Sequence, residues 1–129
     1  MAWVHLVLML ALVEYFAFGQ LVGRARSKYQ VKAPATAGNP IFERYFRVQQ
    51  NTLELLIVFL PLLWIAASYW NPIWIAAIGA VFVIGRLLYF RGYVREASQR
   101  HIGFQLSSVP IVLLALGSVI GVARTLLGI

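Results

Sequence analysis

Four long apolar segments alternate with short polar breaks along the chain, and this alternation predicts four helices. Their expected ranges are residues 2–22, 42–69, 73–98 and 104–127. Each is at least as long as the roughly 20 residues that a helix needs to cross the hydrocarbon core of a bilayer. We therefore expect an all-α membrane protein, a single bundle of four transmembrane helices over residues 1–129. The first segment lacks the pattern of a cleaved signal peptide, so we expect it to be retained.

The breaks between these segments differ in length and charge. Residues 23–39 are expected to form a loop with four basic residues and no acidic one, whereas Trp70, Asn71 and Pro72 form a very short turn. The short turn predicts a tight antiparallel hairpin of the second and third segments. Basic residues gather in the first loop and between the third and fourth segments, which places both of these ends in the cytoplasm.

Composition supports a membrane location. The chain is 61% hydrophobic with a mean hydropathy of +0.80, whereas a soluble domain is closer to 45–50% apolar. The formal net charge of +7 is concentrated at the ends of the apolar segments. We attribute it to membrane lipid, topology and an anionic ligand, and we expect no nucleic-acid partner. With no cysteine and only His5 and His101, we expect no metal site.

Two sets of polar residues each share one face of a predicted helix. The set on the second segment stands at spacings i, i+3, i+4 and i+7 and comprises Arg47, Gln50, Asn51 and Glu54. The set on the third stands at i, i+3, i+7 and i+14 and comprises Arg86, Tyr89, Tyr93 and Arg100. A charged side chain near the middle of a membrane helix costs about 2.5–3.5 kcal/mol. Because the two helices are antiparallel, the two sets are expected to face each other and enclose one pocket near the cytoplasmic end.

Two interpretations of these polar residues remain open. In the first they satisfy one another, with Arg47 paired to Glu54 and Arg86 or Arg100 paired to Glu96. In the second they form a ligand site, which the excess of 11 Lys and Arg over 4 Asp and Glu favours. Arginines with one glutamate suit an anionic ligand that also carries an ammonium group.

Gln49 and Arg26 raise the question of a second subunit. Gln49 lies two residues from Arg47, about 200° around the helix, so one chain cannot direct both into one pocket. If both contact a ligand, the site lies between subunits, and Arg26 in the basic loop is able to reach a neighbour's site likewise. The alternative for Gln49 is a hydrogen bond between helices.

Glu14 is a further polar residue, within the apolar register of the first segment. One interpretation is a structural carboxyl group, protonated or hydrogen-bonded across helices. The other is a role in ligand binding or proton transfer.

The motifs FERYFRVQQNTLE and RLLYFRGYVREASQR, together with the loop APATAGNP, resemble the family of membrane-associated proteins in eicosanoid and glutathione metabolism (MAPEG). The resemblance covers most of the chain. It implies a homotrimer of four-helix subunits that binds glutathione between neighbours near the cytosolic face. It also implies that the glutathione contacts are Arg47, Asn51, Glu54, Tyr89, Tyr93 and Arg100, joined by Arg26 and Gln49 of the adjacent subunit.

The same resemblance implies an activity. Arg100 matches the arginine that would hold the glutathione sulfur as a thiolate, so it is the expected catalytic residue. The expected function is that of a membrane glutathione transferase, which conjugates glutathione to a lipophilic electrophile. The same site is expected to use glutathione as a peroxidase does, to reduce a lipid hydroperoxide. Leu55 and Ser27 replace a tyrosine and an arginine of the leukotriene-synthase branch, which argues against leukotriene synthesis. The alternatives are a non-catalytic lipid-binding scaffold of the same fold and a small transporter subunit. We expect a bacterial inner membrane, with the site toward the cytoplasm.

Overall fold

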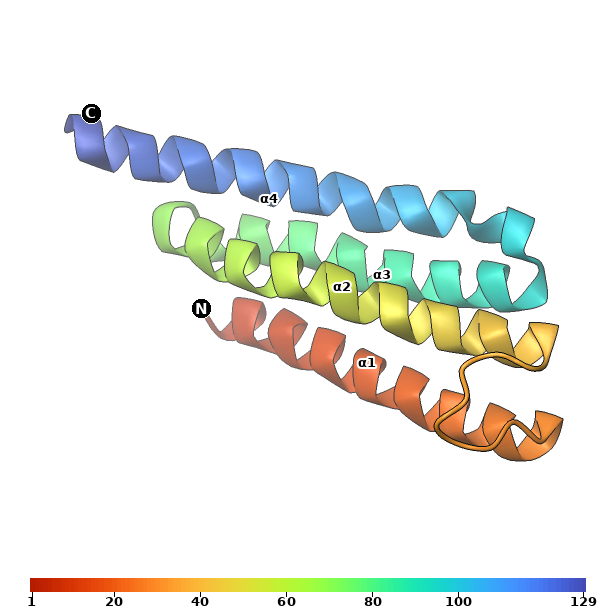
Figure 1. Cartoon of the computed structure of the whole chain (residues 1–129). Helices are drawn as coiled ribbons and strands as arrows, with labels where there is room; N and C mark the ends of the chain where they lie inside the picture. The colour runs from red at the N-terminus through yellow and green to blue at the C-terminus, as the bar shows by residue number, and fades with distance from the viewer.

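Four long helices make up nearly the whole molecule. A computed structural model describes all residues, 1–129. The helices are α1 (Ala2–Tyr29), α2 (Pro40–Tyr69), α3 (Pro72–Arg95) and α4 (His101–Leu127), with a short 3-10 helix η1 (Ala97–Arg100) before α4 (Figure 1). Each long helix is long and apolar enough to cross a membrane. The prediction of an all-helical chain with four candidate spans is confirmed.

Several helix boundaries differ from those predicted. α1 continues to Tyr29, so Arg24, Arg26 and Lys28 lie on a helix and the first loop is only residues 30–39. Nothing in residues 23–29 stops a helix, because Gly23 is merely a weaker helix former. The helix ends instead at Gln30, in a left-handed conformation with φ 56°. At the other junction α3 ends at Arg95, and η1 and α4 fill residues 97–127, so no open loop separates them.

Two asparagines set where the middle helices begin. The side chain of Asn39 accepts hydrogen bonds from the backbone N–H of Ile41 (2.9 Å) and of Phe42 (3.0 Å). Asn71 accepts one from Ile73 (2.9 Å). A proline follows each asparagine at the first helical position, where its missing N–H is not needed. The two-residue connection Trp70–Asn71 therefore produces the predicted α2–α3 hairpin.

The connections alternate between two ends of the bundle. Figure 1 shows both termini at the same end as the α2–α3 turn, and the first loop and η1 together at the opposite end. The predicted polar sets on α2 and α3 lie toward the end that carries the first loop and η1, which we call the basic end. Any polar pocket between α2 and α3 thus opens near this end.

Apolar side chains fill most of the interior of the bundle. Phe59 of α2 stacks on Phe82 of α3 with ring centroids 3.9 Å apart, and both side chains are fully buried with Leu63 and Leu114. Only 29 of 129 residues are buried. Because the outward faces are also rich in Leu, Ile, Val and aromatic residues, the surface suits hydrocarbon rather than water.

α4 approaches α3 closely at two glycines, Gly85 of α3 and Gly103 of α4. A Cβ atom at Gly103 would overlap the backbone of Tyr89, and one at Gly85 would lie 2.6 Å from the carbonyl carbon of Leu106. Small residues allow membrane helices to pack backbone to backbone. Gly103 therefore fixes the start of α4 beside Tyr89, which belongs to the pocket described below.

Gly103→Ala tests this close approach. The added methyl group forces α4 away from α3, and overpacking of this kind costs about 1–3 kcal/mol. We expect a lower thermal unfolding midpoint for the purified protein in detergent. Gly23→Ala is the matched control, because a Cβ atom there meets nothing within 4 Å and alanine favours a helix. A midpoint for Gly103→Ala equal to that of Gly23→Ala would contradict the tight packing.

Candidate functional site

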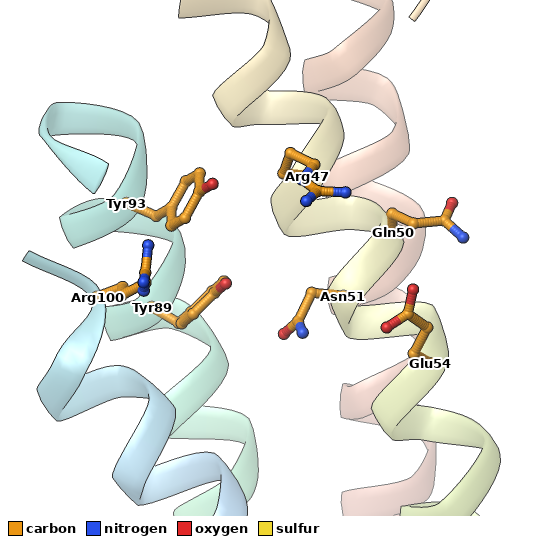
Figure 2. A pocket seen from close by; sticks show the side chains of 7 residues that line it. All are labelled: Arg47, Gln50, Asn51, Glu54, Tyr89, Tyr93 and Arg100. Carbon is orange, nitrogen blue, oxygen red and sulfur yellow. The ribbon is translucent and has the colours of Figure 1, made fainter. Parts of the chain in front are cut away.

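A polar pocket of about 280 Å³ lies between α2 and α3 near the basic end. α2 contributes four lining residues, α3 contributes two and η1 contributes one. They are Arg47, Gln50, Asn51, Glu54, Tyr89, Tyr93 and Arg100 (Figure 2). The structure thus brings together side chains from two separate sequence motifs.

The pocket contains six of the eight residues predicted to contact glutathione. These are Arg47, Asn51, Glu54, Tyr89, Tyr93 and Arg100. Gln50, which the helical spacing placed on the same face of α2, is the seventh lining residue. Arg86 is the exception on α3, because it does not line the pocket although the spacing predicted that it would. What the six residues bind stays a prediction.

Two stacked tyrosines form the α3 wall of the pocket. The rings of Tyr89 and Tyr93 lie 5.5 Å apart and are inclined by 24°. Tyr89 is buried, whereas Tyr93 is half-buried one turn nearer the basic end. The guanidinium carbon of Arg86 lies 4.3 Å from the centroid of the Tyr89 ring. This wall is therefore anchored from behind and presents aromatic surface to the pocket.

The charged residues of the pocket do not neutralise one another. The structure contains no ion pair between a basic and an acidic side chain, so the pairs Arg47–Glu54 and Arg100–Glu96, which the first interpretation required, do not form within the single chain. Glu96 accepts a long hydrogen bond from Gln99 (3.4 Å), and the only hydrogen bond of the Arg100 guanidinium is to the carbonyl of Ala97 (3.5 Å). Arg47, Glu54 and Arg100 are exposed, so their charges are available to a ligand.

Arg86 lies at the centre of the bundle rather than in the pocket. Its guanidinium is fully buried and forms four hydrogen bonds, to Asn51, to Thr52 twice and to Ser107. These acceptors belong to α2 and α4, whereas Arg86 belongs to α3. The pair of Arg86 with Glu96 does not form either, because uncharged oxygens satisfy the donors of Arg86.

Arg26 and Gln49, the two residues assigned to a neighbouring subunit, lie outside the pocket of their own chain. Arg26 donates to the carbonyl of Ala35 (2.6 Å), and its guanidinium carbon lies 4.9 Å from the centroid of the Phe42 ring. The side chain of Gln49 packs against Gly19 of α1. A Cβ atom at Gly19 would lie 3.0 Å from the side-chain nitrogen of Gln49. Gln49 and Arg47 therefore face different sides of α2, as their spacing predicts. The contribution of Arg26 and Gln49 to a neighbour's site remains a prediction.

Glu14 is buried in α1, and neither of its carboxylate oxygens has a hydrogen-bond partner. It does not line the pocket. The hydrogen bond across helices that one interpretation required is thus missing within this chain.

Sequence reasoning missed a second cavity beside the pocket. It has a volume of about 620 Å³, shares Arg47 and Tyr93 with the pocket, and extends over the first loop and the start of α2. Arg44 lines it and donates to the carbonyls of Val94 (3.4 Å) and Arg95 (3.1 Å) at the end of α3. No spacing pattern signals this cavity, because it depends on where the loop folds. It provides an approach to the pocket from the basic end.

The chemistry of the pocket is that of a site for a charged, polar molecule. Two arginines offer donors to carboxylates, one glutamate offers an acceptor to an ammonium group, and two tyrosine hydroxyls and two amides add neutral hydrogen-bonding groups. No group of three or more His, Cys, Asp or Glu residues is placed to hold a metal ion.

Comparison with known proteins identifies the family of the chain. The sequence matches the MAPEG family over residues 4–120. It is 46% identical over 120 residues to an uncharacterised protein of Synechocystis, covering 93% of this chain and 88% of that protein. It is 44% identical over 114 residues to human microsomal glutathione S-transferase 2, covering 88% of this chain and 76% of the relative. Bovine leukotriene C4 synthase is 41% identical over 83 residues, 64% of this chain and 55% of the synthase.

A bundle of four apolar helices with a polar pocket at one end defines an integral, multi-pass membrane protein. The chain belongs to the MAPEG family. The family membership predicted from the two motifs and the first loop is thereby confirmed.

Proposed function

We propose that this protein is an integral membrane glutathione transferase. The observation that carries the proposal is the pocket, in which arginine and glutamate charges lie together without pairing. Glutathione has two carboxylates and one ammonium group, which match that set of charges. The relatives named as microsomal glutathione S-transferase 2 and leukotriene C4 synthase support the same choice of co-substrate.

Arg100 is the proposed catalytic residue. A free thiol has a pKa of about 8.5, and half-ionisation at pH 7 requires a decrease of about 1.5 units, equivalent to about 2 kcal/mol. One hydrogen bond to a charged group contributes about 1.5–3 kcal/mol, so one guanidinium beside the sulfur is sufficient. Arg100 suits this role because its guanidinium reaches the pocket and has only the weak contact with Ala97.

The thiolate would then attack an electrophile dissolved in the membrane, forming a carbon–sulfur bond and releasing the leaving group. Reduction of a lipid hydroperoxide is the second proposed reaction: the thiolate attacks the peroxide oxygen and releases the lipid alcohol, and a second glutathione then gives glutathione disulfide and water. The polar pocket takes glutathione from the basic end, and the apolar helix surfaces deliver the lipophilic partner. Holding both reactants together lowers the entropic part of the barrier.

We further propose that the working unit is a homotrimer. Gln50 and Glu54 are exposed on a membrane-spanning helix, where uncovered polar groups are costly. A neighbouring subunit that packs on this face of α2 covers them and brings its own Arg26 and Gln49 to the site. By the distribution of basic residues the site faces the cytoplasm, and a bacterial inner membrane is our proposed location.

A conjugation assay tests the proposed function. The purified protein in detergent is mixed with glutathione and a simple aryl halide, and the product is followed by its absorbance. We expect saturable formation of the conjugate, and replacing the aryl halide by a lipid hydroperoxide tests the peroxidase reaction. Glutathione binding without turnover of either substrate would favour the non-catalytic lipid-binding scaffold instead.

A further inference from the structure

Arg86 contacts the ligand pocket indirectly, through Asn51. The Arg86 side chain is fully buried and lines no cavity described above. Its Nη2 donates a hydrogen bond of 2.8 Å to Oδ1 of Asn51, and Asn51 lines the pocket. Arg86, which a ligand cannot reach, is thus hydrogen-bonded directly to Asn51, which a ligand can contact.

This bond determines which end of the Asn51 amide faces the pocket. A guanidinium has donors only, so the amide can meet Arg86 only with its oxygen. The amide nitrogen of Asn51 makes no hydrogen bond within the chain, and the only buried polar atoms without a partner are the two oxygens of Glu14. The Asn51 nitrogen is therefore an accessible donor.

The guanidinium itself has little freedom to move. Thr52 Oγ1 accepts from Nε (3.2 Å) and from Nη2 (2.9 Å) of Arg86, and Ser107 Oγ accepts from Nη1 (3.3 Å). Each hydroxyl donates its own hydrogen to a backbone carbonyl, Thr52 to Val48 and Ser107 to Gly103, both at 2.7 Å. Each hydroxyl oxygen therefore faces Arg86 with its lone pairs, and acceptors on two neighbouring helices, α2 and α4, fix the plane of the guanidinium.

We propose that Arg86 is a positioning residue, which holds the Asn51 amide with its nitrogen toward the pocket so that this wall binds a hydrogen-bond acceptor of the ligand. The acceptor is a carboxylate or peptide carbonyl of glutathione, and the inference rests on the proposed function. Without Arg86 the amide is free to rotate, and an oxygen turned toward the ligand acceptor repels it.

A double-mutant cycle tests whether Arg86 acts through Asn51. The variants are Arg86→Met, Asn51→Ala and the combination, and calorimetry measures the Kd of glutathione for the assembled protein in detergent. We expect each single variant to bind about tenfold more weakly, because one directed hydrogen bond is lost. The double variant should bind no more weakly than Asn51→Ala within about twofold. The thiolate absorbance at saturating glutathione should be unchanged, because Arg100 is intact.

Effects of Arg86→Met that multiply with those of Asn51→Ala would overturn the proposal, because a merely structural role does not depend on Asn51. If Arg86→Met does not assemble, Thr52→Val takes its place. It removes the hydroxyl that holds Nη2, and we expect it to raise the Kd of glutathione about fivefold. In the Asn51→Ala background Thr52→Val should leave the Kd unchanged. A rise in Kd that persists in that background contradicts the proposal. Ser108→Ala is the control, because Ser108 makes no hydrogen bond to Arg86, and its Kd should be unchanged.

The wild-type titration distinguishes a failure of the proposed function from a failure of the role of Arg86. If the wild-type protein does not bind glutathione, the proposed function fails and the role of Arg86 fails with it. If the wild-type protein binds glutathione but the cycle shows independent effects, only the role of Arg86 is wrong.

Discussion

Arg100→Ala is expected to abolish most of the thiolate signal of bound glutathione while part of the binding remains. Without the guanidinium the thiol pKa returns toward about 8.5, so the ionised fraction at pH 7 falls from about one half to about 3%. We expect kcat for aryl halide conjugation to fall by about 10- to 100-fold, which corresponds to one lost charge-assisted hydrogen bond. Ultraviolet difference spectra and steady-state kinetics measure the two effects separately.

Arg95→Ala is the matched control for Arg100→Ala. It removes the same charge from the same end of the bundle, but Arg95 lies at the end of α3 and does not line the pocket. We expect its thiolate signal and kcat to equal those of the wild type within about twofold. A thiolate signal that Arg100→Ala leaves unchanged would remove Arg100 from the catalytic role.

Glu54→Gln is expected to weaken glutathione binding by about 10- to 100-fold. Glu54 is the only acid that lines the pocket and has no basic partner in the chain, so we expect it to bind the ammonium group of the ligand. A hydrogen bond between charged groups contributes about 1.5–3 kcal/mol, and about 1.4 kcal/mol corresponds to a tenfold change in Kd. Titration calorimetry with the assembled protein measures the change.

N-acetylglutathione, which lacks the ammonium charge, identifies the group that Glu54 binds. The wild type should bind glutathione about 10- to 100-fold more tightly than the acetylated compound. Glu54→Gln should bind the two compounds with nearly equal affinity. Glu96→Gln is the control, because Glu96 lies outside the pocket beside Gln99. A preference for glutathione that survives in Glu54→Gln would show that another residue holds the amine.

The helical pattern was sufficient to predict the four spans and most of the pocket. Spacings of three, four and seven residues on α2 place Arg47, Gln50, Asn51 and Glu54 on one face regardless of tertiary detail, and the short turn at Asn71 brings α3 alongside. The failure at Arg86 has a physical reason. Arg86 is one turn further from the basic end than Tyr89, where α4 packs closely against the neighbouring Gly85 and Ser107 of α4 bonds to the guanidinium.

Features that depend on packing between distant segments could not be read from the sequence. The continuation of α1 through its basic residues reflects the absence of a strong helix breaker before Gln30, and the charge pattern alone suggested a loop. The capture of the Arg26 guanidinium by Ala35 and the cavity lined by Arg44 depend on how residues 30–39 fold back. No periodicity encodes that path.

The most direct test is a cryo-electron microscopy structure of the protein in lipid nanodiscs with glutathione. We predict three copies of the chain, with glutathione density between α2 and α3, its sulfur nearest Arg100, and Arg26 and Gln49 of an adjacent copy in contact with it. A monomeric particle in which Arg47 and Glu54 pair with each other, or glutathione bound away from this pocket, would contradict the account.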